Sequence, residues 1–163
     1  MRKIHICLIE PEIPQNTGNI ARTCAVTGAS LHLVKPFGFE ITSARLKRAG
    51  LDYWDKLDIT YYESLAEFLE KHQEDPLYFF SQKGRHCYTE ISYPEEVFLV
   101  FGKESCGLPE ELLCSHAENT VRIPMRPTLR SLNLGNSVAL AAYEVLRQDG
   151  FEDLQTEGKL SLF

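Results

Sequence analysis

The chain has 163 residues, of which 44% are hydrophobic and 25% charged, a composition typical of one globular domain with a substantial core. Its formal net charge of −6 argues against binding of nucleic acid through bulk charge, but it leaves room for a local basic patch. The apolar run within residues 1–12 is far too short for a signal peptide or a membrane span, so we expect a cytoplasmic protein without a membrane partner.

The first part of the chain alternates a predicted strand with a predicted helix. Residues 4–9 are the first strand, and a loop with two prolines follows it. Helical spacing of apolar residues then predicts a helix, with Asn16 or the threonine after it as N-cap and Gly28 as its end. Residues 31–34 are a second strand. A basic helical turn at residues 43–50 is either a solvated helix face or part of a rim that binds a polyanion.

The middle of the chain continues this alternation. Residues 59–62 are a third strand, and Ser64 opens a helix with the spacing of a capping box. Residues 77–81 are the fourth strand. Residues 97–101 are the fifth and most apolar strand, and a glycine-rich turn at residues 102–108 follows it directly.

The last part of the chain is a strand, a polar loop and a helix. Residues 120–123 are the sixth strand, and a polar, basic loop follows it at residues 124–131. Ser131 or Asn133 is expected to cap the last helix, whose small residues would let another backbone approach closely. The tail after Gly150 is weakly patterned. Short strands alternating with helices indicate an α/β fold, with a parallel sheet covered on both faces, in a single domain over residues 1–163.

The position of the glycine-rich turn argues against the common nucleotide-binding folds. The first strand-to-helix turn carries prolines and lacks the G-x-G-x-x-G fingerprint of a Rossmann fold, and Gly102-Lys103 lacks the preceding glycine of a P-loop. Gly102 and Gly107 would let backbone amides approach a ligand, or would simply form a tight turn. With the polar loops at 81–84 and 124–131, this turn would form one pocket at adjacent strand ends.

Cysteine and histidine give little functional signal. The five cysteines are odd in number, none has C-x-x-C spacing, and we expect most of them to be buried, reduced thiols. Cys114 and His116 lack a second pair with the spacing of a metal site, so we expect no metal. The five histidines are scattered along the sequence, and we interpret each as structural or solvated.

Three stretches together resemble the SPOUT class of S-adenosylmethionine-dependent RNA methyltransferases. They are NTGNIAR at residues 16–22, FGKESCGL at 101–108, and IPM at 123–125 running into SLNLGNSVA at 131–139. The minimal length and the EPEIPQNTGN opening are similar to the small tRNA 2′-O-ribose methyltransferases that act on the wobble nucleotide, cytidine or uridine at position 34. Each motif alone is weak, but three in order at matching separations are specific.

The resemblance implies a fold and partners that periodicity does not show. It implies a parallel sheet whose C-terminal segment is tucked through a loop as a deep trefoil knot, a feature otherwise nearly absent from proteins. It also implies a homodimer packed through the first and last helices. The implied cofactor is S-adenosylmethionine and the implied partner is tRNA.

Carried over by position, the resemblance also implies the residues of the cofactor pocket. They would bind largely through backbone groups and through apolar contact with the adenine. The cofactor-binding positions are Phe80, Gly102, Gly107, Ile123, Met125, Ser131, Leu132 and Asn133.

The implied catalytic residues act by positioning and by charge. We expect Arg22 to orient a phosphate and to stabilise an emerging alkoxide, because a guanidinium with a pKa above about 12 is a poor base. Asn16 would hold the loop or the ribose, and Glu104 would fix the glycine turn or meet the substrate. Tyr143 on the last helix is a further candidate. The alternatives are a surface charge for Arg22, a structural role for Glu104, and core or interface packing for Tyr143.

A local basic face would hold the RNA, and binding should weaken steeply with salt. Its candidate residues are Arg45, Lys47, Arg48, Lys83, Arg85, Arg126 and Arg130. Three other functions stay open at this point: a non-catalytic RNA-binding relative, a 2′-O-methyltransferase acting elsewhere on tRNA or rRNA, and a different α/β enzyme with a nucleotide cofactor.

Overall fold

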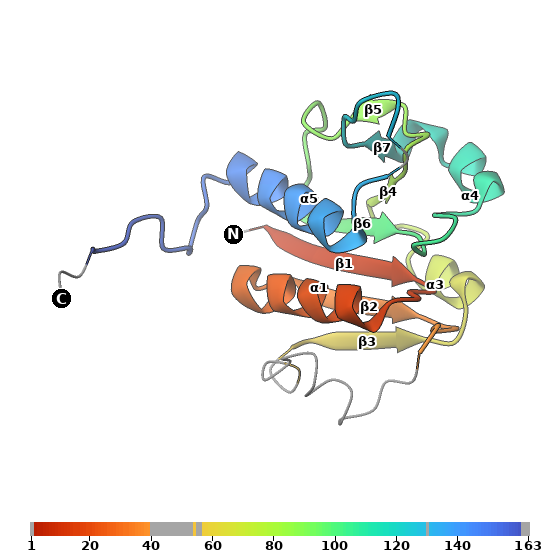
Figure 1. The fold of residues 1–163 in the computed structure, drawn as a ribbon, viewed down its shortest axis with the longest axis horizontal. Coiled ribbons are helices and arrows are strands. Elements are labelled where there is room, and N and C mark those ends of the chain that lie inside the picture. The colour runs from red at the N-terminus through yellow and green to blue at the C-terminus, as the bar shows by residue number, and fades with distance from the viewer. Residues whose placement is uncertain (1, 40–53, 55–56, 130, 161–163) are drawn as a thin grey trace.

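A computed structural model describes residues 2–39, 54, 57–129 and 131–160, so the predicted basic turn at 43–50 lies outside the described residues. These residues form a parallel sheet in the order β3-β2-β1-β6-β4-β7-β5 (Figure 1). The strands are β1 (Lys3–Ile9), β2 (Ser30–Val34), β3 (Ile59–Tyr62), β4 (Leu77–Phe80), β5 (His86–Cys87), β6 (Glu96–Phe101) and β7 (Thr120–Arg122). All six predicted strands are confirmed. Among the strands of the described residues, β5 alone was not predicted, because it has two residues and no apolar run.

Helices cover both faces of the sheet, as predicted. Figure 1 shows α1 (Pro14–Thr27) and α5 (Leu134–Gln148) side by side in front of it. The other face is covered by α3 (Leu65–Lys71) and α4 (Glu110–Ser115), and a 3-10 turn, Ala117–Asn119, leads into β7. Side chains along β1 point alternately to the two faces of the sheet. Ile6 and Leu8 pack in the core under α1 and α5, whereas Cys7 packs in the core under α3 and α4.

The helix ends show where local sequence rules hold. Gly28 is left-handed, with φ of 75°, and its N–H donates to the carbonyl of Cys24, as expected of a C-terminal glycine. Asn133 caps α5 by accepting from the N–H of Asn136, so the alternative of Ser131 as cap is wrong. The prediction that Asn16 or its neighbour caps α1 is also wrong. The helix begins at Pro14, whose ring suits the first helical position, and the side chain of Asn16 is thereby free for other contacts.

The expectation of mostly buried thiols is wrong. Cys7 and Cys24 are buried, Cys87 is half-buried, and Cys106 and Cys114 are exposed. Exposure follows from position, because Cys106 lies in the turn after β6 and Cys114 on the outer side of α4. Within the described part of the chain, no cluster of three or more His, Cys, Asp or Glu side chains could hold a metal ion. No described helix is long and apolar enough to span a membrane.

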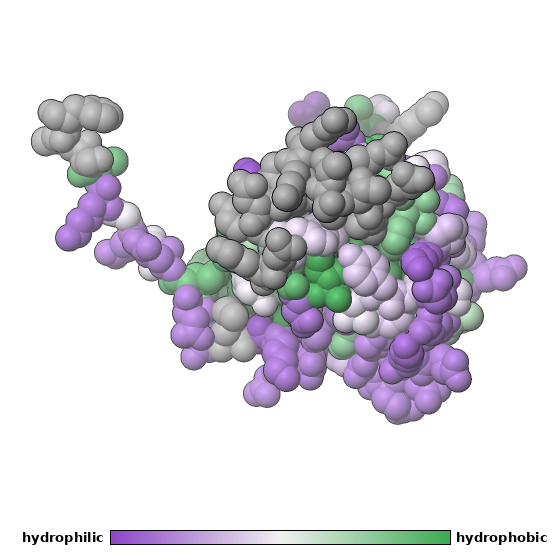
Figure 2. Space-filling view, turned by 90° about the horizontal axis from the view of Figure 1, so that it is seen from below, coloured by the Kyte–Doolittle hydropathy of each residue, from purple (hydrophilic) through white to green (hydrophobic). Residues whose placement is uncertain are grey.

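The chain after α5 leaves the body of the molecule. Phe151 and Leu154 still pack against the core, and residues 155–160 extend away from it (Figures 1 and 2). The histidines are scattered along the sequence, but the fold gathers some of them. Three of them, His5, His32 and His72, lie in one line of hydrogen bonds on the α3 side of the sheet.

Candidate active site

One large cavity lies at the carboxyl edge of the sheet. Its volume is about 1010 Å³, and it is lined by the ends of β1, β4 and β6 and by the loop after β7. β1 and β6 are neighbours; β2 and β3 lie beyond β1 on one side of them, and β4, β7 and β5 lie beyond β6 on the other. Such a switch point opens a crevice between the loops, which is where open α/β sheets bind their ligands.

The glycine turn after β6 closes tightly on itself, and this requires glycine. A Cβ at Gly102 would lie 2.1 Å from the backbone carbon of Gly107, far inside van der Waals contact. Gly107 has a φ of 72°, and its N–H donates to the carbonyl of Lys103 over 2.8 Å. At Gly102 and Gly107 the turn thus presents bare backbone to the cavity, as expected for backbone recognition of a ligand.

Glu104 links this turn to the start of α1. Its carboxylate accepts from the backbone N–H of Glu12 at 2.8 Å, from that of Ile13 at 3.2 Å and from the side-chain amide of Asn16 at 2.9 Å. Glu12 and Ile13 lie just before the first residue of α1, where backbone N–H groups have no partner within the helix, so a carboxylate here satisfies donors that would otherwise lack one. Of the two roles expected for Glu104, the contacts in this structure are those of fixing the loop.

Two further carboxylates tie the same loops together in the opposite direction. Glu12 accepts from the N–H and the hydroxyl of Ser105, at 2.8 and 2.9 Å. Glu10 pairs with Lys103 at 2.7 Å, and its carboxylate raises the pKa of that lysine above its ordinary value. Lys103 is therefore a cation at neutral pH and cannot serve as a general base.

The start of α5 is held to the start of α1 by two asparagines. Asn16 is only 6% exposed, and its carbonyl oxygen accepts from the side-chain amide of Asn133 at 3.0 Å. Asn133 also caps α5. A continuous path thus runs from Glu104 through Asn16 to the helix that follows the loop after β7, and all three stretches of the motif set meet at one wall of the cavity.

The opposite wall is apolar and aromatic. Phe80 at the end of β4 stacks on Phe101 at the end of β6, with ring centroids 4.7 Å apart. Ile123 follows β7 beside them. A cavity with hydrophobic walls and a few fixed polar groups suits a flat heterocycle with a polar extension.

The structure brings together most of the residues implied by the resemblance. All eight expected cofactor positions line the cavity, and Asn16 and Glu104 line it with them. Arg22 and Tyr143 do not belong to its described lining. Both are exposed, Arg22 on α1 and Tyr143 on α5.

Three of the seven expected RNA-binding residues belong to the described part of the chain. Arg126 is exposed on the loop after β7. Lys83 pairs with Glu110 at 2.6 Å, and Arg85 pairs with Glu118 at 2.5 Å. The remaining four, Arg45, Lys47, Arg48 and Arg130, lie outside the described residues.

Sequence reasoning missed the contribution of the proline-containing loop after β1. Glu10, Glu12, Lys103 and Ser105 join it to the glycine turn. The two stretches are about 90 residues apart in the sequence, so no local pattern pairs them. Acidic residues alternating with Pro11 and Ile13 were the available signal, because a proline-stiffened loop holds its carboxylates in fixed directions.

The comparisons with known proteins agree with this geometry. The model of the SpoU rRNA Methylase family matches residues 3–143. The tRNA (cytidine(34)-2′-O)-methyltransferase of Escherichia coli is 44% identical over 149 residues, covering 91% of this chain and 95% of that protein.

Solved structures show the same likeness. A structure described as giving insight into 2′-OH methylation of C/U34 on tRNA is 45% identical and superposes with a TM-score of 0.86, covering 93% of this chain and 99% of that one. An AdoMet-bound rRNA methyltransferase from Sinorhizobium meliloti is 26% identical with a TM-score of 0.77, covering 90% of this chain and 57% of that one.

Proposed function

The chain belongs to the SpoU rRNA methylase family, and we propose that it transfers a methyl group from S-adenosylmethionine to the ribose 2′-hydroxyl of nucleotide 34, cytidine or uridine, in tRNA. It would act on tRNA in the cytoplasm. The observation that carries the proposal is the cavity at the ends of β4, β6 and β7, where the three motif stretches meet. The names of the relatives supply the substrate class and the nucleotide position.

The residues present fit the proposed cofactor. Phe80 and Ile123 offer an apolar wall for the adenine, and the turn from Gly102 to Gly107 offers backbone groups for its polar parts. The AdoMet-bound neighbour supports this choice of cofactor by family. When bound, S-adenosylmethionine supplies an activated methyl on a sulfonium, so the protein's task is to position and to stabilise.

The reaction is an in-line displacement at the methyl carbon. The ribose oxygen forms the new C–O bond as the C–S bond breaks, and the hydroxyl proton leaves through phosphate or water. Arg22 orients the neighbouring phosphate and stabilises the negative charge that develops on the oxygen. Glu104 and Asn16 hold the walls in place, and Asn133 fixes the start of α5 against them.

The exposed position of Arg22 supports a homodimeric enzyme whose site needs a second copy. Arg22 is exposed on α1 and does not belong to the described lining of its own cavity. The helices α1 and α5 also expose large apolar side chains, namely Val26 at 57%, Leu140 at 43% and Tyr143 at 46%. Pairing two copies through these helices would cover that surface and carry Arg22 towards the partner's cavity. Tyr143 then packs in the seam.

A deep trefoil knot at the C-terminal end is part of the same proposal. β7 lies beyond β4 from β6, whereas α5 packs on α1, β1 and β6. The chain therefore returns across the carboxyl ends of β4 and β6, past the loops at 81–83 and 102–108 that line the cavity with it. Threading through one of these loops would give the cavity a wall that is fixed at both ends.

The test is methyl transfer itself. Purified protein is incubated with labelled S-adenosylmethionine and bulk tRNA, and the labelled nucleoside is identified by mass spectrometry. We expect 2′-O-methylcytidine or 2′-O-methyluridine, mapped to position 34. Label on a base would contradict the ribose assignment. Binding of S-adenosylmethionine without any methyl transfer would favour a non-catalytic RNA-binding relative.

A further inference from the structure

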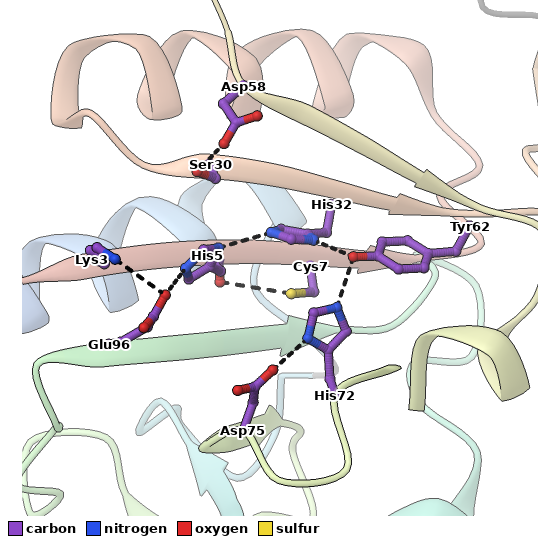
Figure 3. A network of polar contacts seen from close by, with 10 residues as sticks. All are labelled: Lys3, His5, Cys7, Ser30, His32, Asp58, Tyr62, His72, Asp75 and Glu96. Carbon is purple, nitrogen blue, oxygen red and sulfur yellow. Dashed lines mark hydrogen bonds and ion pairs between the residues drawn. The ribbon is translucent and has the colours of Figure 1, made fainter. Parts of the chain in front are cut away.

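A line of five hydrogen bonds crosses the sheet on the α3 side, away from the cavity (Figure 3). It begins at Glu96, whose carboxylate lies 3.1 Å from Nε2 of His5. Nδ1 of His5 lies 2.9 Å from Nε2 of His32, and Nδ1 of His32 lies 2.8 Å from the hydroxyl of Tyr62. That hydroxyl lies 2.8 Å from Nε2 of His72, whose Nδ1 lies 2.7 Å from the Asp75 carboxylate.

The centre of this histidine chain is buried and its ends reach solvent. Tyr62 is 2% exposed and His32 is 6% exposed. The carboxylate side chains at the two ends, Glu96 and Asp75, are 50% and 41% exposed. Water can therefore exchange protons with the ends, whereas the central contacts depend on the protons of the chain itself.

With its three rings and its phenol neutral, the histidine chain has one proton fewer than its hydrogen bonds require. Every contact joins two heavy atoms at hydrogen-bond distance, so each of the five requires one proton. Three neutral imidazoles supply one proton each and the phenol supplies one, while ionised carboxylates supply none. The total is four. A neutral chain would press two lone pairs together at one contact, and a buried acceptor without a donor is costly.

We propose that the histidine chain is a binding site for one additional proton, held between Glu96 and Asp75. With the charge on His72, that ring donates to Tyr62, Tyr62 donates to His32, and His32 donates to His5. With the charge on His5, the same three contacts run in the opposite direction. The terminal contacts are the same in both arrangements, so reversing the three central bonds moves a charge across three strands without moving a heavy atom.

The charge belongs on the terminal rings. Burial, with the neighbouring His5 and His72, lowers the pKa of His32 to about 4, so the central ring stays neutral. His5 faces Glu96, and His72 faces Asp75. Each terminal imidazolium would therefore have a carboxylate partner.

Other charged and titratable groups face the chain from the elements packed against it. On β1, Lys3 lies 3.9 Å from Glu96, and the buried thiol of Cys7 has its pKa raised by burial. From α3, Lys71 lies 5.5 Å from the centre of the Tyr62 ring, and Glu67 pairs with that lysine. Asp58, just before β3, accepts a hydrogen bond from the hydroxyl of Ser30. None of these groups supplies a proton to one of the five contacts.

The direct test is the total charge of the three rings at pH 8, measured by NMR of protein labelled with ¹⁵N-histidine. Ordinary histidines with a pKa near 6.5 would together carry about 0.1 of a charge at this pH. We expect a total close to one, with His32 neutral. His86 and His116 are internal references in the same spectra. A total near zero at pH 8 would overturn the proposal.

Asp75→Asn tests the count itself at an exposed position. The amide of asparagine can donate to Nδ1 of His72, which supplies the fifth proton without a charged ring. We expect the total ring charge at pH 8 to fall to about zero while the contacts persist. An unchanged total would overturn the proposal.

Tyr62→Phe separates proton counting from simple attraction to a carboxylate. It removes two contacts and one proton, so the three remaining contacts are satisfied by three neutral rings. Both carboxylates stay in place. We therefore expect the ring charge to be lost, and a charge that persists beside intact Glu96 and Asp75 would show that attraction to the carboxylates, rather than the missing proton, holds it.

Discussion

Glu104→Gln should loosen the wall of the cavity, and the structure allows its cost to be worked out. The wild-type carboxylate accepts from Glu12, Ile13 and Asn16, one donor on Oε2 and two on Oε1. Glutamine replaces one oxygen with a donor, so at least one of the three donors then faces an N–H group. The other contacts weaken, because they lose a charged acceptor.

The lost and weakened hydrogen bonds together cost a large free energy for a substitution that replaces one oxygen atom with an NH₂ group. A hydrogen bond to a charged group contributes roughly 1.5–3 kcal/mol, and a neutral one about 1 kcal/mol. We expect the free energy of unfolding to fall by about 3 kcal/mol, which for a chain of this size corresponds to a melting temperature lower by about 8 °C. The affinity for S-adenosylmethionine should also fall, by about tenfold, because the glycine turn loses its link to α1.

Thermal unfolding and calorimetric titration with S-adenosylmethionine measure the two effects. Glu111→Gln is the matched control, since Glu111 is an exposed residue on α4 and the chemical change is the same. We expect it to leave both values unchanged. If Glu104→Gln melted and bound the donor as the wild type does, the view of Glu104 as the link between the two loops would be refuted.

The other predictions concern the reacting group, the glycine turn and acid stability. Arg22→Ala should keep its affinity for S-adenosylmethionine in calorimetry and lose most turnover. Equal loss of both would place Arg22 in the wall of the cofactor cavity. Mixing Arg22→Ala with the pocket variant Leu132→Glu should restore about a quarter of wild-type turnover, since random exchange makes about half of the dimers mixed, each with one complete site. No recovery would mean that Arg22 serves its own cavity. Gly102→Ala should abolish donor binding, because its Cβ would lie 2.1 Å from the backbone of Gly107, and unchanged calorimetry would contradict this. His32 has its pKa lowered from 6.5 to about 4, so its contribution to stability is full above pH 6.5 and falls as the pH is lowered towards 4. Urea unfolding should show a loss of about 2 kcal/mol from this residue between pH 8 and 5, absent in His32→Gln.

Periodicity and turn chemistry predicted most of the fold because the signals are local. Each predicted strand is an apolar run, and the ends of α1 at Gly28 and of α5 at Asn133 follow from single residues. Strand order is not local. Nothing near β6 in the sequence indicates that it lies between β1 and β4, and this order is what brings the ends of the three strands to one cavity.

The eight positions expected from the resemblance line the cavity. From the residues alone, the pocket was predictable from the polar loops at the strand ends and from the glycines that fix backbone shape. Gly102 and Gly107 could be assigned to the cavity because their turn tolerates little else. The carboxylate links of Glu10 and Glu12 were not, since an acidic residue in a loop is usually solvated. Likewise, His5, His32 and His72 are far apart in the sequence. The parallel alignment of β1, β2 and β3 brings His5, His32 and Tyr62 into line, and the end of α3 places His72 beside Tyr62.

A crystal structure with S-adenosylmethionine, or with its demethylated product, tests the central claim most directly. The account predicts the adenine against Phe80 and Ile123, and the amino-acid end near the backbone of the turn from Gly102 to Gly107. A ligand seated instead beside the proline loop at residues 11–14, away from Gly102 and Ser131, would contradict it.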